Sequence, residues 1–281
     1  MDYLKIYLLS ICILSFSTFA FADDSSLSKE NYTLFNPTPR EQMREFSTDR
    51  PDKMESSYTV DAGHFQHETD LVNLSFNNDR GDRESAALVM APNLKVGINN
   101  RIDLQLVVES FNYNTQKVDG SRTKRSGFGD LTTRLKVNII GNDEGDVALA
   151  IMPYLKFPTN QGELGNNSVE GGVIAPLTIS ISETTSLGLM GQIDIVRDDR
   201  GDGYVGELVY ITNVGQSLTD DFGGYLEFWS SVSPLRGVSS TVDIGLFYEV
   251  VEDTQLDLGV NVGMTEAADD LNPFIGISQR F

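Results

Sequence analysis

Two histidines and two acids lie close together in the stretch HFQHETD, and their chemistry stands out first. His64, His67, Glu68 and Asp70 carry side chains of the types that bind transition metals. On a β-strand, however, residues three positions apart point to opposite faces, so His64 and His67 cannot easily hold the same ion. We therefore expect no metal site in this stretch and no cofactor.

Nucleophilic acyl transfer is the second chemistry to consider. It needs a histidine base held beside a serine and oriented by a third polar residue. The chain has 2 histidines, both in one stretch, and no recognisable serine motif accompanies them. We therefore expect that the protein is not an enzyme.

Two RGD tripeptides, Arg80–Asp82 and Arg200–Asp202, are candidates for adhesion to a receptor. Short tripeptides recur by chance, and Gly and Asp are ordinary turn residues, so turn chemistry is the simpler interpretation. The twelve-residue calcium-loop pattern is absent from the sequence around them. The acids in and beside these tripeptides that would suit calcium are Asp79, Asp82, Asp198, Asp199 and Asp202.

The charge balance and the cysteine content exclude several classes of protein. There are 21 basic and 41 acidic residues, for a formal net charge of −20. Such an excess of acid disfavours binding to nucleic acid. The one cysteine, Cys12, lies in an N-terminal segment that we expect to be removed, so the mature chain should hold no disulfide and no cysteine-ligated zinc.

The N-terminus has the features of an export signal. Lys5 precedes an apolar run (6–21), and the small residues Ala20 and Ala22 permit cleavage after Ala22. A membrane anchor is the alternative, but the run is barely long enough to cross a bilayer and contains several serine and threonine residues. A bulky Ile11 directly before the cysteine argues against a lipoprotein signal.

The rest of the chain follows a period of two. After Thr254, the apolar residues Leu256 and Leu258 alternate with polar or small residues such as Asp257, which is typical of a strand with one apolar face. No segment of the mature chain shows a convincing helical period. The alternation predicts about twelve strands, which begin near residues 64, 85, 102, 129, 147, 169, 186, 204, 222, 240, 254 and 271.

The lengths of these strands and of their connections indicate a membrane barrel. Many run for about ten residues or more, whereas the strands of soluble proteins average about five or six. Compact turns such as GNDEGD alternate with longer loops such as TQKVDGSRTKRSG. We predict an all-β fold, a transmembrane up-and-down antiparallel β-barrel of about twelve strands. Its last strand should pair with the strand near His64, because a closed barrel leaves no edge.

Two parts of the sequence resemble known outer-membrane barrels. FIGISQRF, which alternates and ends on Phe281, resembles the C-terminal insertion signal of Gram-negative outer-membrane barrels. The stretches FSTDRPDKMESSYTVDAGHFQHET (46–69), VGINNRIDLQL (96–106) and YLKFPT (154–159) resemble the transporter family named for the meta-pathway of phenol degradation. This resemblance covers most of residues 46–281 and implies an outer-membrane barrel.

These observations predict three segments: a signal peptide (1–22), a periplasmic or lumen-occluding segment (23–62) and an outer-membrane β-barrel (63–281) in the cell outer membrane of a Gram-negative cell. We expect a monomer whose partners are outer-membrane lipid and lipopolysaccharide, the outer-membrane insertion machinery and a small solute. The basic stretch with Arg122, Lys124 and Arg125 either contacts lipopolysaccharide phosphates or is solvated.

Polar residues on the face opposite the apolar one are candidates for lining the lumen. They are Glu68, Asp103, Glu109, Asp130, Arg134, Lys136, Lys156, Asp194, Glu207, Glu227, Asp243, Glu249 and Asp257. Because acids outnumber bases in this set, we expect cations and neutral molecules to pass better than anions. The predicted function is a channel or transporter for passive passage of small solutes. The alternative is a non-conducting structural or surface-interaction barrel that acts through its external loops.

Overall fold

The computed structural model describes residues 29–79, 82–162, 164–165, 167–198, 200–201 and 203–281. The predicted signal peptide and Cys12 lie outside these residues, as do Arg80, Asp199 and Asp202 of the candidate adhesion and calcium segments. Two short 3-10 helices, η1 (Lys29–Asn31) and η2 (Arg40–Gln42), precede the strands. No helix in the described part of the chain has the length and apolar character to cross a bilayer.

From Phe65 onward the described chain consists of antiparallel strands joined by turns and loops. The strands are β1 (Phe65–Asp79), β2 (Asp82–Asn99), β3 (Ile102–Val108), β4 (Phe111–Val118), β5 (Ser121–Gly127), β6 (Leu131–Ile140), β7 (Val147–Phe157), β8 (Glu170–Ser180), β9 (Thr185–Arg197), β10 (Tyr204–Ser217), β11 (Phe222–Ser233), β12 (Gly237–Val251), β13 (Thr254–Gly263) and β14 (Leu271–Arg280).

The strands close into a barrel, because β1 is hydrogen-bonded to both β2 and β14. Strands β3 and β4 pair with different halves of β2, and β6 and β5 pair with them in turn. β3 and β4 therefore share one position in the wall, and β6 and β5 share the next. The fourteen strands thus form a closed barrel of twelve positions, with the β4–β5 hairpin as an extension. The predicted antiparallel barrel of about twelve strands is confirmed.

The C-terminal strand lies against the first strand of the barrel, as predicted. Gln66 is opposite Arg280, and the backbone N–H of Phe281 donates to the carbonyl of Phe65 at 2.7 Å. The N–H of Phe65 donates back to the carbonyl of Phe281 at 3.2 Å. The last residue of the chain thus completes the closure of the wall between β1 and β14.

The two faces of the wall differ in the way that the alternation predicts. Leu258 is 54% exposed on the outer face, whereas its neighbour Asp257 is 2% exposed. The outer face carries exposed Leu, Ile, Val, Phe and Tyr side chains on strand after strand. Such an apolar band around a barrel is what a lipid bilayer requires.

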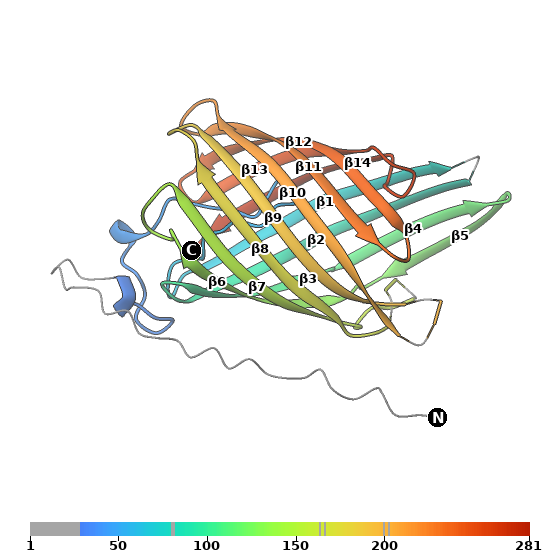
Figure 1. The fold of residues 1–281 in the computed structure, drawn as a ribbon, viewed down its shortest axis with the longest axis horizontal. Helices are drawn as coiled ribbons and strands as arrows, with labels where there is room; N and C mark the ends of the chain where they lie inside the picture. Colours follow the sequence, from blue (N-terminus) through green and yellow to red (C-terminus); the bar gives the residue numbers. More distant parts are fainter. Residues whose placement is uncertain (1–28, 80–81, 163, 166, 199, 202) are drawn as a thin grey trace, which may run out of the picture.

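One region that reads as a loop in the sequence is a pair of strands. The stretch around residues 115–127 forms most of the β4–β5 hairpin, which extends beyond the rest of the barrel at the end opposite the C-terminus (Figure 1). From Asn114 onward, polar and charged residues occupy both faces of this hairpin, so most of it lacks the apolar alternation that identifies the other strands. Its turn contains Asp119 and Gly120, both with positive φ (49° and 81°), as two-residue hairpin turns require.

The N-terminal segment enters the barrel at the end that carries the C-terminus (Figure 1). Residues 44–61, here called the plug, contact inward-facing side chains of the wall from β1 to β13. The isolated bridges that flank the plug join Thr33 to Asn99 and Ala62 to Gly97. Within the described residues the plug itself forms no β-bridge, so side-chain contacts hold it in place.

Candidate functional site

The plug and the inner wall meet first in a buried cluster of lysines and acids. Asp49 of the plug accepts hydrogen bonds from Lys95 of β2 (2.5 Å) and Lys136 of β6 (2.8 Å). Lys95 also donates to Glu68 of β1, whose carboxylate accepts from the N–H groups of Asp49 and Arg50 at 2.9 Å each. Burial alone raises the pKa of the Asp49 carboxyl, but Lys136 and Lys95 hold that pKa well below its usual value.

Arg50 forms the second contact, a bridge between two strands of the wall. Its guanidinium lies 2.6 Å from Asp70 of β1 and 2.6 Å from Asp257 of β13, with a further bond from Nε to Asp257 at 3.1 Å. A side chain on residue 276 would collide with this guanidinium, because a Cβ there would lie 2.2 Å from Nη2. Gly276 therefore provides the space in which Arg50 lies.

The tip of the plug docks on β11 and β12. Glu227 of β11 accepts from the backbone N–H groups of Lys53 (3.0 Å) and Met54 (3.1 Å), so its carboxylate holds the turn of the plug. The Lys53 ammonium lies 3.1 Å from Asp243 and 4.7 Å from the centre of the Trp229 ring. Backbone and side chain of the tip are therefore both bound by the wall.

An apolar patch covers the other side of the tip. Met54 packs with Met152, Met190 and Ile174, and also with the neighbouring Val209 and Ile211. These wall residues come from β7 to β10, whereas the acids and lysines described above belong to other strands. At the level of the plug tip the lumen thus has one apolar side and one charged side, and the plug contacts both.

Two acids of the plug lie close to charged groups of the wall. Asp52 and Glu227 both accept from the same amide nitrogen of Asn213, at 2.7 and 3.3 Å. Burial and the nearby Glu227 carboxylate raise the pKa of Asp52 well above its usual value. Burial also raises the pKa of Glu55 to about 7, although Arg134 lies only 2.6 Å away and opposes the shift.

The base of the plug is fixed near the turns that join the strands. Arg44 donates to the carbonyl of Asn100 at 2.6 Å and lies 3.3 Å from Asp61. Asp61 is fully buried and also pairs with Arg280 of β14 at 3.4 Å. Val60 donates its N–H to Asp103 of β3 at 3.1 Å.

The structure places seven of the thirteen predicted lumen residues against the plug: Glu68, Asp103, Arg134, Lys136, Glu227, Asp243 and Asp257. The other six lie elsewhere. Lys156 pairs with Glu170 at 2.6 Å and with Asp130 at 3.9 Å, and Asp194 accepts from Tyr154. Glu109 accepts from the N–H of Asp130, Glu249 accepts from the N–H of Asp253, and Glu207 is half-buried.

Several contributors to this site were not among the predicted residues. Asp49, Arg50 and Lys53 lie in a segment with no periodic signal, although the DRPD stretch that carries two of them is part of the family resemblance. Lys95 faces inward because the alternation of β2 shifts by one residue near Met90, which has a φ of 53°. Such a shift is invisible to a strict count of alternate residues.

The histidines form ordinary hydrogen bonds. His64 bonds through its two ring nitrogens to the carbonyls of Phe281 (2.9 Å) and Thr38 (2.7 Å). His67 contacts Thr69 and Gln279, and its ring stacks on Phe281. In the described residues, His, Cys, Asp and Glu side chains form no group of three or more that is placed to hold a metal.

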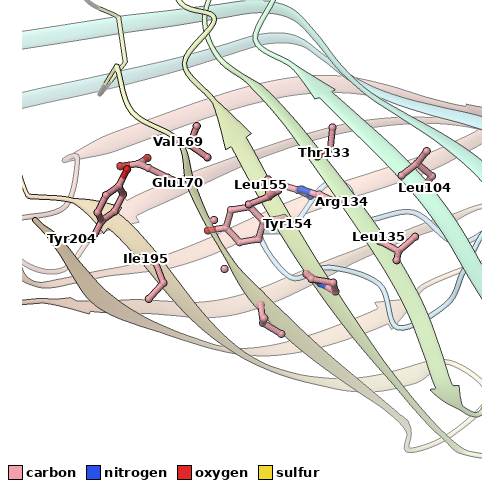
Figure 2. Close-up of a pocket in the computed structure, with 14 residues that line it drawn as sticks. Leu104, Thr133, Arg134, Leu135, Tyr154, Leu155, Val169, Glu170, Ile195 and Tyr204 are labelled. Carbon is pink, nitrogen blue, oxygen red and sulfur yellow. The ribbon is translucent and has the colours of Figure 1, made fainter. Parts of the chain in front are cut away.

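Two hollows lie outside the plugged part of the lumen. A groove of about 630 Å³ extends from Tyr204 at one end to Leu104 at the other (Figure 2). Its apolar members Leu104, Leu155 and Ile195 are roughly half exposed and belong to the outer face, so membrane lipid covers it. A smaller cavity of about 240 Å³ lies on the inner side and is lined by Asn73, Ser75, Asn112, Asp269 and Asn272, among others.

A family model and a solved outer-membrane channel agree with this fold. A family model with the description "Putative MetA-pathway of phenol degradation" matches residues 48–281. A crystal structure of an outer membrane channel from Pseudomonas putida F1 superposes with a TM-score of 0.57 and 14% identity, over 78% of this chain and 93% of that chain. A structure of the NanC porin gives a TM-score of 0.47 and 11% identity, over 76% and 98% of the two chains. No curated protein sequence matches significantly.

Proposed function

The chain belongs to this family, and on that premise we propose that it is a monomeric outer-membrane channel for passive passage of small solutes, with the plug as its gate. The observation that carries the proposal is the plug itself: a segment without strand pairing lies inside the lumen and is held there largely by hydrogen bonds and ion pairs. Contacts of this kind are reversible, because water or a solute can replace them.

The plug also sets the charge of the passage. Arg50 lies between Asp70 and Asp257 of the wall, and Lys53 pairs with Asp243, so two cations of the plug offset part of the charge of three wall acids. When the plug leaves, these acids remain in a narrow bore, where unbalanced charge attracts cations. The open channel therefore prefers small cations and neutral molecules to anions, and the preference weakens as salt rises.

The proposal includes the surroundings of the barrel. Outer-membrane lipid contacts the apolar band, lipopolysaccharide surrounds the external end, and the insertion machinery binds the terminal strand that ends on Phe281. The plugged end and its compact turns face the periplasm. A non-conducting barrel that acts through its external loops is the alternative that the experiment below tests.

A reversible disulfide between plug and wall tests the gate. The Oγ atom of Ser57 lies 3.0 Å from Oγ1 of Thr178 on β8, which is within reach of a disulfide after replacement of both by cysteine. The only natural cysteine is in the predicted signal peptide, so no other thiol interferes. In planar bilayers, oxidised Ser57→Cys/Thr178→Cys protein should be silent and should show discrete conductance steps after reduction.

The control is Thr178→Cys alone, which should conduct with and without reductant. Heat-modifiable migration shows whether each sample is folded. If the folded wild type, the control and the reduced double variant all show no conductance, the result supports the non-conducting alternative. Equal conductance of the oxidised and reduced double variant shows that the plug does not gate the channel.

A further inference from the structure

Three cations lie side by side on the hairpin that extends beyond the barrel. In the strand register, Arg83 of β2 is opposite Lys117 of β4, and Lys117 is opposite Arg122 of β5. Residues directly opposite each other point to the same face, with Cα atoms about 4.5 to 5.5 Å apart. We call Arg83, Lys117 and Arg122 the cation row. Lys124 lies on the same face, one step closer to the membrane, opposite Thr115.

The cation row is on the outer face of the wall. Lys117 is separated by even numbers of residues from Phe111 and Tyr113, whose rings are 49% and 37% exposed. The intervening Asn112 points the other way and lines the inner cavity. Four residues of strand separate Tyr113 from Lys117, which is roughly 13 Å. Aromatic side chains mark the interface of a membrane barrel, so the cation row lies at the level of lipid head groups.

The electrostatics of the row favour an anionic ligand. Like charges directly opposite on neighbouring strands destabilise a sheet, and here three positive charges are adjacent. All three side chains are exposed, and in the described part of the chain none of them forms an ion pair. The acids at the hairpin tip, Asp82 and Asp119, interact with each other through a backbone N–H at 3.2 Å.

We propose that the cation row binds phosphate groups of lipopolysaccharide in the outer leaflet of the membrane. A phosphate accepts several charge-assisted hydrogen bonds and can lie between neighbouring cations, which cancels their mutual repulsion. The row faces sideways along the wall, where the occupant is membrane lipid. This inference rests on the proposed outer-membrane location and on the external position of the hairpin, and it is independent of solute passage.

Isothermal calorimetry tests the proposal: the purified barrel in detergent is titrated with lipopolysaccharide, and the heat gives the affinity of binding. Lys117→Gln/Arg122→Gln should weaken binding by roughly tenfold or more, because charge-assisted hydrogen bonds are lost. The matched control is Arg236→Gln, which removes an exposed cation from the turn between β11 and β12 and should leave the affinity unchanged. An unchanged affinity of the double variant overturns the proposal.

A second measurement compares the thermal stability of Lys117→Gln with that of the wild type. The sign of the difference should change when lipopolysaccharide is added. Without lipopolysaccharide, Lys117→Gln should raise the temperature at which the barrel loses its heat-modifiable form, since a repulsion has been removed. With lipopolysaccharide present, the same variant should be less stable than the wild type. A solvated row gives the same sign in both conditions, which contradicts a bound phosphate.

Two further titrations identify the source of the phosphate. The wild type should have a low affinity for dephosphorylated lipopolysaccharide. This affinity should be no higher than that of the double variant for intact lipopolysaccharide. If inorganic phosphate, or vesicles of phosphatidylglycerol, binds the wild type as tightly as lipopolysaccharide does, the assignment to lipopolysaccharide is wrong. Bilayer conductance of the double variant should equal that of the wild type, so a failure of the channel proposal is distinguishable from a failure of this one.

Discussion

Replacement of Arg50 by glutamine should open the channel. The Arg50 guanidinium is 13% exposed and bridges Asp70 and Asp257, which are 20% and 0% exposed. Its removal leaves both acids without their plug cation, and loss of one partner of a buried pair costs about 3 to 5 kcal/mol. Because Asp70 is partly solvated, we take the lower end, about 3 kcal/mol, which changes the docking equilibrium by roughly 100-fold.

The assay is the open probability of single channels in planar bilayers at low salt. The matched control is Arg40→Gln, since Arg40 is 62% exposed and lies 4.0 Å from Asp253. Surface pairs of that kind contribute about 0 to 1 kcal/mol, so the control should change the open probability by less than about fivefold. Asp257→Asn in the Arg50→Gln background should partly restore closure, because it neutralises one of the acids left without a partner.

The reasoning is refuted if folded Arg50→Gln protein has an open probability within about fivefold of the wild type. It is also refuted if Arg40→Gln has the larger effect. Heat-modifiable migration of each variant establishes that the barrel is folded, so a change in conductance is not a change in yield.

Three other measurements test the gate, the faces of the wall and its orientation. Because burial raises the pKa of Glu55 from 4.5 to about 7 in the docked plug, docking is strongest below pH 4.5 and weakens as the pH rises toward 7. Conductance should therefore rise over that range and should depend less on pH in Glu55→Gln, whereas a fall in wild-type conductance contradicts the assignment. Leu258→Arg should lower the stability of the barrel by about 2 to 4 kcal/mol in a denaturant titration, while Glu183→Arg, in an exposed turn, should have little effect. A tag at Gly120 should be labelled on intact cells and one at Asp143 should not; labelling of both would contradict the proposed orientation.

The strands and the closure of the barrel were predictable because each spanning strand buries one face and exposes the other. Because of that constraint, polar and apolar residues alternate in segments such as the one that holds Asp257 and Leu258. The sequence predicts a loop in place of most of the β4–β5 hairpin, because this part of the chain lies beyond the apolar band and has no apolar face. Backbone hydrogen bonds to β2 fix its position in the wall. Such bonds do not depend on the side chains, so the sequence shows no alternation there.

The lining of the lumen was predictable in part. Facing residues such as Glu227 and Asp243 follow from the alternation, but their partners do not, since Lys53 lies 174 residues before Glu227 in the chain. The predicted excess of lumen acids omitted the charges of the plug, which are three bases and five acids in residues 44–61, because a segment without periodicity gives no indication of where its charges lie. The preference for cations is accordingly a property expected of the open lumen.

The plug also has a consequence for the order of events during assembly. Its residues precede every strand of the barrel, yet Arg50 contacts Asp257, which is 207 positions later. Contacts at such separations form late, because the chain between them must be ordered first. The plug is thus the last part of the barrel that can reach its final position, although it precedes the strands in the sequence. A docked plug requires that the final strands are already in place. A barrel that stalls before β13 joins the wall would leave its plug without the contact to Asp257 and therefore more exposed than in the finished barrel.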